Sequence, residues 1–330
     1  MESLTVVSCH RILAAESAYG AGRERSIEQG TIATFSAKRL LTRVHYEEGA
    51  YFPADYTMNL YRGCNHGCIY CDTRSECYGI DRFDEIRYKD NCLAMLEAEL
   101  RQKRKPGVVS LGAASDSYNA AENTLGLTRQ ALQLLKRYSF GVGIPTKGDL
   151  VARDTDILAE MGRAAPVYVS FSITTAEDGI SRLLEPGAPA SSRRFAAMKE
   201  LAAAGILVGT WLNPMLPFLT DSDDNLLALV DETAASGGRF ALCHFGMTLR
   251  GGNREYFYAA LEKEPRFQGV KQRYVNAFGL RYECASPRAD RLWLIFQERC
   301  EKRKLLYRFK DIARAAGEYG PTQMKLFVDS

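Results

Sequence analysis

Residues 58–71, MNLYRGCNHGCIYC, place a short apolar run directly before a group of cysteines. The run at 58–61 is typical of a strand that is covered on both faces. The cysteines follow in a CxxxCxxC spacing: Cys64, Cys68 and Cys71. Gly63 and Gly67 let the backbone curl without Cβ clashes, and three thiolates on one loop can converge on a soft metal centre. The stretch therefore predicts a metal-binding loop after a strand.

Beyond this stretch, strand-like and amphipathic segments alternate along the chain. Further strands are predicted at 108–111, 140–144, 167–173, 206–212 and 240–243. Helices are predicted at 90–103, 128–138, 154–161, 192–204 and 223–235. This β–α alternation indicates six parallel strands with right-handed helical crossovers, in either a barrel or a doubly wound sheet.

Polar residues follow the predicted strands, where β/α folds build their sites. They are Ser115, Asp116, Thr146, Lys147, Ser172, Asn213 and His244. Each one taken alone is equally well explained as a cap of the next helix. Their repetition favours a partial (β/α)6 barrel over residues 51–250, with an N-terminal extension at 1–50 and a C-terminal helical extension and tail at 251–330.

Composition places the chain among globular proteins, with 330 residues, 46% hydrophobic and 25% charged. A net charge of +3 requires neither a nucleic acid nor a membrane as partner. No apolar run reaches the roughly 18 residues of a membrane span, and the first residues lack signal-peptide features, so we expect a cytoplasmic protein with no membrane partner. Nine cysteines, an odd number, argue against a secreted disulfide framework.

Two metal centres are compatible with the cysteines. A 4Fe-4S cluster on three thiolates leaves one iron open to bind a substrate or cofactor. The alternative is a closed tetrahedral zinc site with Cys77 as fourth ligand. Zinc sites more often pair two CxxC halves across a longer loop, which favours the cluster. His66, inside the loop, is expected to form a local hydrogen bond or to face the cofactor.

With Tyr70 as the aromatic residue, the spacing resembles the CxxxCxΦC signature of the radical S-adenosylmethionine (SAM) superfamily. The resemblance implies that the open iron binds SAM and that the reduced cluster cleaves it to methionine and a 5′-deoxyadenosyl radical, which abstracts a hydrogen from the substrate. It also implies a reductase partner such as flavodoxin or ferredoxin.

The resemblance covers residues 56–213 and is closest to the spore photoproduct lyase-like branch. The segments that carry it are 115–119 with Glu122, Thr146-Lys147 with Arg153-Asp154, and 171–175 with Glu185-Pro186. It implies that Ser115, Lys147 and Ser172 contact SAM, with Lys147 near its carboxylate, Ser172 near its ribose and Tyr70 beside its adenine. A carboxylate favours a cationic partner, and ribose hydroxyls favour a short donor and acceptor.

Two departures argue against the lyase reaction itself. The lyase has a hydrogen-donating cysteine where this chain has Ala113, and a tyrosine where this chain has Asp72. Cys243 and Cys284 are alternative hydrogen donors, although a buried packing role is the more common one for cysteine.

Three further stretches carry hints of partners. Residues 247–254 hold two arginines that are compatible with an anionic substrate or with an ordinary surface loop. Residues 288–314 hold nine basic and four acidic residues, which we interpret as a solvated helix face. The tail at 323–327, QMKLF, resembles the peptide by which bacterial repair proteins bind the DNA sliding clamp; the alternative is a tail folded onto the barrel.

The leading hypothesis is a radical SAM enzyme acting on damaged or modified nucleic acid. The second keeps the chemistry but has a peptide or small metabolite as substrate. The third is a zinc-binding interaction protein without catalytic activity.

Overall fold

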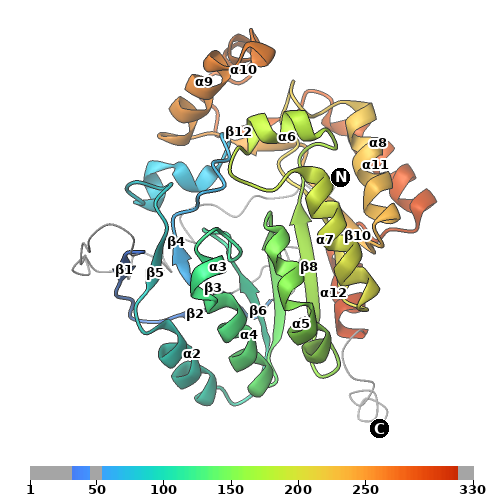
Figure 1. Cartoon of the computed structure of the whole chain (residues 1–330). Coiled ribbons are helices and arrows are strands. Elements are labelled where there is room, and N and C mark those ends of the chain that lie inside the picture. The colour runs from blue at the N-terminus through green and yellow to red at the C-terminus, as the bar shows by residue number, and fades with distance from the viewer. Residues whose placement is uncertain (1–31, 45–53, 319–330) are drawn as a thin grey trace.

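The computed structural model describes residues 32–44 and 54–318, and its main sheet contains the six predicted parallel strands. The strand order is β10-β9-β8-β7-β6-β3-β2 (Figure 1). The bounds are β2 (Leu41–Arg43), β3 (Tyr56–Met58), β6 (Val108–Leu111), β7 (Gly141–Thr146), β8 (Val167–Ser172), β9 (Leu207–Leu212) and β10 (Phe240–Cys243). Within this sheet, β3, β6, β7, β8, β9 and β10 are parallel, and β2 pairs antiparallel with β3. The sheet is open between β2 and β10, which confirms a partial rather than a closed barrel.

The first parallel strand begins and ends earlier than the sequence predicts. It covers Tyr56–Met58, whereas Tyr61 belongs to β4 (Tyr61–Arg62) in a second sheet. There β5 (Arg87–Lys89) pairs antiparallel with β4 and parallel with β1 (Thr34–Phe35). Leu60 and Tyr61 are both buried. The apolar run at 58–61 therefore extends beyond the end of β3, because Leu60 and Tyr61 are buried after the chain has left the main sheet.

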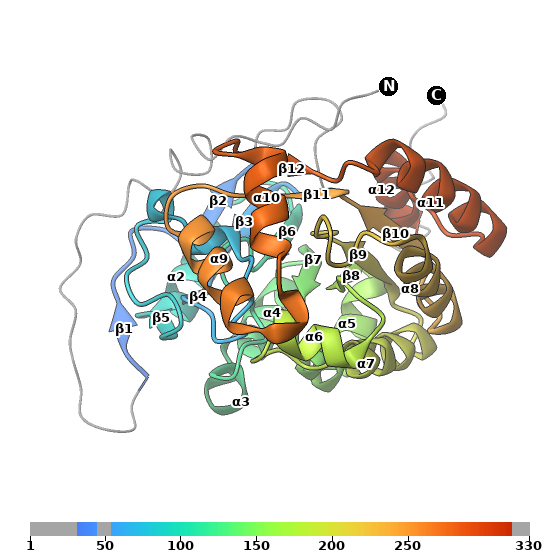
Figure 2. The same ribbon diagram turned by 90° about the horizontal axis from the view of Figure 1, so that it is seen from above.

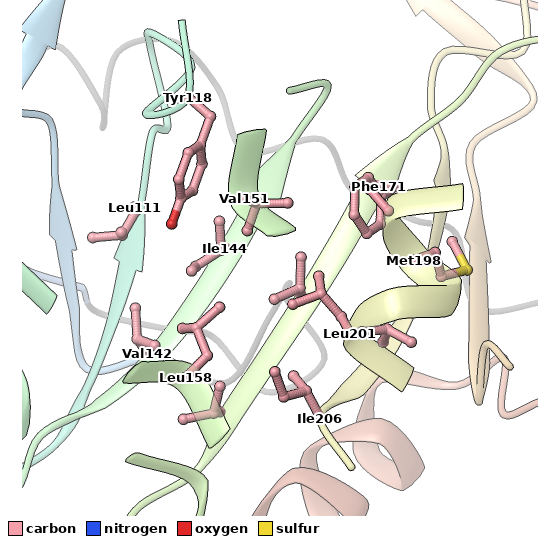
Figure 3. Close-up of a cluster of buried hydrophobic side chains, with 14 of the residues drawn as sticks. Leu111, Tyr118, Val142, Ile144, Val151, Leu158, Phe171, Met198, Leu201 and Ile206 are labelled. Carbon is pink, nitrogen blue, oxygen red and sulfur yellow. The ribbon is translucent and has the colours of Figure 1, made fainter. Parts of the chain in front are cut away.

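Helices cover one face of the sheet (Figure 2). The five predicted helices are α2 (Cys92–Arg101), α4 (Leu127–Arg137), α5 (Thr155–Gly162), α7 (Ser191–Ala203) and α8 (Asp223–Ala235), each within two residues of its predicted bounds. Shorter elements join them: α3 (Glu122–Leu125), η3 (Asp149–Asp154) and α6 (Asp178–Leu184). Figure 3 shows the core between the layers, where Val142 and Ile144 of β7 lie near Leu158 of α5. Burial of such side chains stabilises a fold by about 1.5–3 kcal/mol each.

A terminal helix packs on the other face of the sheet. Ile312 and Ala316 of α12 (Phe309–Glu318) are buried together with Tyr168 of β8 and Phe240 of β10. Tyr168 lies against Gly143, where a Cβ would be 2.2 Å from the ring. The inner face is therefore filled at this level and does not form an open channel.

A cap, residues 246–286, lies over the carboxyl ends of the strands, at the top of Figure 1. It consists of β11 (Gly246–Thr248), α9 (Asn253–Lys263), η4 (Pro265–Phe267), α10 (Val270–Phe278) and β12 (Glu283–Ala285), which pairs antiparallel with β11. The rings of Phe257 and Tyr274 pack edge to face in its core, 5.2 Å apart. The same hydrophobic cluster includes Ile69 and Tyr70, so the cap and the cysteine stretch share one core.

The basic stretch at 288–314, which follows the cap, forms ion pairs with α8. Arg291 and Arg299 of α11 (Ala289–Arg303) form ion pairs with Asp223 and Asp231. Arg288 also pairs with Asp223. Most of the basic side chains of this stretch are exposed, as predicted, and part of the arginine excess also holds α11 on α8.

Within residues 32–44 and 54–318, no helix is long and apolar enough to cross a membrane. The sliding-clamp-like peptide at 323–327 lies outside the described residues, as does most of the predicted extension at 1–50.

Candidate functional site

The cysteine loop, residues 63–71, follows β4 and leads into η1 (Asp72–Arg74). Gly63 begins it at φ +79°, and a Cβ there would lie 2.3 Å from the Glu85 carbonyl oxygen. The Cys64 amide donates to the Phe83 carbonyl at 2.8 Å. The backbone conformation and the lack of space both explain why glycine precedes the first cysteine.

The three thiols are neighbours in a largely buried site. Cys64 and Cys68 are buried, and Cys71 is partly buried. Burial raises the pKa of Cys64 to about 12 and raises the pKa values of Cys68 and Cys71, and Cys71 further raises the pKa values of Cys64 and Cys68. Thiols ionise when they bind iron, so a cluster held here would replace the protons of all three groups.

Lys147 supplies a positive charge beside the thiols. Its Nζ lies 5.7 Å from the centre of the Tyr70 ring. Burial lowers the pKa of Lys147, but the nearby Cys68 and Glu185 outweigh burial, so the pKa is raised overall. A charged ammonium next to three thiols fits a site for a thiolate-bound cluster and for a carboxylate ligand.

Ser115 and Asp116 connect the loop with β7. The Ser115 hydroxyl donates to the Gly63 carbonyl. Asp116 accepts from the Thr146 hydroxyl and from the Lys147 amide, both at 2.7 Å. The same carboxylate lies 3.5 Å from Nδ1 of His66, whose pKa is lowered chiefly by burial. A neutral His66 in a local contact is the expected arrangement.

Glu185 and Arg194 are site residues to which the sequence analysis assigned no role. Their side chains are both 0% exposed and form an ion pair. The Tyr70 hydroxyl donates to Glu185, and Arg194 Nη1 donates to the Ser172 carbonyl at 2.9 Å. Glu185 did lie in a segment that carried the family resemblance, but a single glutamate gave no local sign of this contact.

The structure therefore brings Tyr70, Lys147 and the backbone of Ser172 into one network with the three cysteines. The contacts of Ser115, Lys147, Ser172 and Tyr70 with SAM stay a prediction. Two other residues from the resembling segments, the buried Glu122 and the partly buried Arg153, form a separate ion pair at 2.6 Å.

The donor arrangement does not favour a single-ion zinc site. In the part of the chain that the structure describes, no three His, Cys, Asp or Glu side chains converge closely enough to hold one metal ion. The Cys77 sulfur instead lies 3.3 Å from Nη1 of Arg250. With Cys77 in contact with Arg250, the loop itself offers three thiols, which fit a three-cysteine cluster site better than a closed four-ligand zinc site.

The two alternative hydrogen-donor cysteines occupy packing positions. Cys243 lies against the core between the sheet and its helices, where it is near Cys300 of α11. Cys284 is 1% exposed in the core of the cap. The structure favours a packing role for both.

Both arginines of the 247–254 stretch are engaged within the protein. Arg250 forms an ion pair with Asp72 at 3.3 Å and stacks over Tyr282. Arg254 is buried and donates to the carbonyls of Leu249, Gly279, Leu280 and Arg281. They hold the cap together, which disfavours the hypothesis of an anionic substrate at this stretch.

The sequence pattern of the radical SAM superfamily matches residues 58–230. The chain belongs to this superfamily. An uncharacterized protein of Mycobacterium tuberculosis is 34% identical over 221 residues, which are 65% of this chain and 65% of that protein. The chain thus covers just under two thirds of the length of this relative. An uncharacterized protein of Methanocaldococcus jannaschii is 29% identical over 51% of this chain and 63% of its own.

The radical SAM fold resembles that of spore photoproduct lyase. The structure of that lyase complexed with dinucleoside spore photoproduct matches with a TM-score of 0.59 and 16% identity, over 82% of this chain and 79% of the lyase. At this identity the similarity concerns the fold. It confirms the lyase-like branch as the structural neighbourhood of this radical SAM protein.

Proposed function

We propose that this radical SAM protein holds a 4Fe-4S cluster on Cys64, Cys68 and Cys71 and uses it to cleave SAM reductively. The observation that carries the proposal is the set of three neighbouring thiols on one loop beside the partly buried, charged Lys147. Membership of the superfamily supports the same assignment.

Each residue of the site has a distinct task in this proposal. The bound cluster and SAM together supply a 5′-deoxyadenosyl radical that abstracts a hydrogen atom from the substrate. Lys147 binds the carboxylate of SAM, Tyr70 lies beside the adenine, and Ser172 and Ser115 offer hydroxyl groups to the ligand. The shared core of loop and cap excludes water from the reacting atoms.

The proposed substrate is modified or damaged nucleic acid. The resemblance to a lyase structure complexed with a dinucleoside photoproduct supports this choice. Ala113 and Asp72 stand where the lyase has its hydrogen-transfer residues, so we propose a reaction other than thymine-dimer repair.

Two partners are part of the proposal. A reductase such as flavodoxin or ferredoxin supplies the electron that the cluster requires. The tail at 323–327 docks on the DNA sliding clamp, for which the two apolar anchors Leu326 and Phe327 are suited.

The test begins with anaerobic reconstitution with iron and sulfide, dithionite reduction and chromatographic assay of 5′-deoxyadenosine. Wild-type protein should form 5′-deoxyadenosine, and Cys68→Ala should lose both the cluster and the product. Cys77→Ala is the matched control, because Cys77 contacts Arg250, and it should retain the cluster. A Cys68→Ala protein with full cleavage would refute the site assignment.

The substrate is tested separately by adding damaged oligonucleotides, peptides or small metabolites to the reconstituted protein. Nucleic acid should raise the rate of 5′-deoxyadenosine formation and bind with salt-dependent affinity. If only a peptide or a metabolite raises this rate, that class of compound replaces nucleic acid as the proposed substrate. The proposed radical chemistry would then still hold.

A further inference from the structure

The carboxylate of Glu185 joins two segments that are far apart in the chain. It accepts the hydroxyl hydrogen of Tyr70, 115 residues earlier, and pairs with the guanidinium of Arg194. Glu185 and Arg194 are both fully buried. A buried ion pair is costly to desolvate and does not by itself stabilise a fold, so its presence calls for a specific role.

Arg194 extends this contact to the carboxyl end of β8. Nη1 donates to the Ser172 carbonyl at 2.9 Å, and Nε donates to the Pro189 carbonyl at 2.8 Å. The rigid guanidinium fork thus fixes the end of the strand relative to the Glu185 carboxylate. Through two side chains, the ring of Tyr70 is held at a defined spacing from Ser172.

The segment around Glu185 also shapes the backbone of the cysteine loop. The Ile69 amide donates to the Leu184 carbonyl and the Gly187 amide to the His66 carbonyl, both at 2.9 Å. A Cβ on Gly187 would lie 2.0 Å from the Asn65 carbonyl oxygen. Loop and segment therefore fit each other without space for adjustment.

The charges leave Lys147 available for a ligand. Glu185 and Arg194 neutralise each other, and Arg194 keeps the pKa of the buried Glu185 below its ordinary value although burial alone would raise it. The ammonium of Lys147 is close enough for Glu185 to raise its pKa, yet within residues 32–44 and 54–318 the two groups form no ion pair.

We propose that Glu185 and Arg194 are positioning residues for SAM, which hold the Tyr70 ring and the Ser172 end of β8 at the spacing that the adenosine part of SAM requires. This inference rests on the proposed function. The pair touches the ligand only through Tyr70, Ser172 and Lys147.

Tyr61, Glu122 and Arg153 form a second Tyr–Glu–Arg group, which provides a matched control for Tyr70, Glu185 and Arg194. Glu122 is also 0% exposed, accepts from the Tyr61 hydroxyl at 2.5 Å and pairs with Arg153 at 2.6 Å. This group has the same three residue types, and its tyrosine and glutamate are also buried, although Arg153 is 29% exposed where Arg194 is 0% exposed. Its partners lie on β4, α4 and η3 instead of in the cysteine loop. Comparison of the two glutamates separates positioning from general stability.

The experiment compares Glu185→Gln, Tyr70→Phe and Glu122→Gln with wild type after anaerobic reconstitution. Three quantities are measured: iron and sulfide per chain, the dissociation constant of SAM by equilibrium dialysis, and the change in the electron paramagnetic resonance signal of the reduced cluster on SAM addition. Glu185→Gln should keep its iron and weaken SAM binding about 10- to 100-fold, as for the loss of a charged hydrogen bond. At saturating SAM, the change in the electron paramagnetic resonance signal of Glu185→Gln should differ from that of wild type.

Tyr70→Phe keeps the ring and removes only its hydroxyl, and it should weaken SAM binding several-fold. If Glu185→Gln does not fold, Tyr70→Phe alone tests the inference. Glu122→Gln should lower the melting temperature while its folded fraction binds SAM within about twofold of wild type, since the hydrogen-bond partners of Glu122 do not include Tyr70, Ser172 or Lys147. Wild-type affinity in both Glu185→Gln and Tyr70→Phe would overturn the inference but leave the proposed function intact. A wild-type protein with full iron content and no SAM binding would overturn both.

Discussion

The hydroxyl of Thr248 in β11 donates a 3.0 Å hydrogen bond to the carboxylate of Asp72, 176 residues earlier in the chain. Asp72 follows the last cysteine of the loop directly. Its carboxylate also accepts from the Tyr78 hydroxyl at 3.0 Å and pairs with Arg250. The residue that stands in place of the lyase tyrosine therefore fastens the cap to the cysteine loop.

Replacement of Asp72 with Asn should loosen the cap. The amide cannot retain both the charge toward Arg250 and all of the accepted hydrogen bonds, at a cost of about 1–3 kcal/mol. Hydrogen exchange should become faster in α9, β11 and β12. Asp84→Asn is the control, because Asp84 pairs with Arg74 in the same region but its side chain is 57% exposed. Equal exchange in the cap of both variants would contradict the fastening role.

Gly63→Ala should prevent cluster loading, whereas Gly269→Ala should not. Both glycines have φ +79°, so the conformational strain is similar. Only at Gly63 does a Cβ meet backbone, at 2.3 Å from the Glu85 carbonyl oxygen; at Gly269 nothing lies within 4 Å. Iron content after reconstitution is the measurement. Similar iron content in the two variants would show that the cysteine loop tolerates the shift.

Lys147→Met should weaken SAM binding and leave the iron content near that of wild type. Loss of the partly buried cation removes a charge-assisted contact with the SAM carboxylate, an effect of about 1.5–3 kcal/mol. Lys103→Met is matched to it, since Lys103 also lies over a tyrosine ring, that of Tyr56, at 4.7 Å. Equilibrium dialysis with SAM measures the difference. The assignment of Lys147 fails if both variants bind SAM with the same affinity.

Asp231 should contribute acid-sensitive stability at the contact between α8 and α11. Arg299 and Arg303 donate to its Oδ1 at 2.6 and 2.7 Å and lower its pKa to about 2 from 3.8. A lowered carboxyl pKa stabilises the fold above the unfolded value, and this contribution is lost as pH falls from about 4 to about 2. After allowance for solvent screening, it amounts to about 1 kcal/mol.

The measurement for Asp231 is urea unfolding of wild type and Asp231→Asn in iron-free chains, which keeps cluster loss out of the comparison. The variant should be less stable at pH 7, and the difference should shrink toward pH 3. A difference in the free energy of unfolding that stays constant over this range would show that the ion pairs do not account for it.

The periodicity of the sequence determined the order of the elements and the open β/α architecture. Helices such as α8 and strands such as β10 were predicted at their observed bounds, because each carries its own apolar pattern. The first strand was misplaced, since the buried Leu60 and Tyr61 look like a continued strand whichever sheet they join.

The spacing of Cys64, Cys68 and Cys71 likewise identified the family from nine consecutive residues, because a short loop must bring its own ligands together. The contacts of Tyr70 with Glu185 and of Asp72 with Thr248 join segments more than 100 residues apart. No local pattern encodes such contacts, since they depend on how α6 and the cap are placed on the sheet. Tertiary structure alone decided which buried charges surround the cysteines and which residues hold the cap against them.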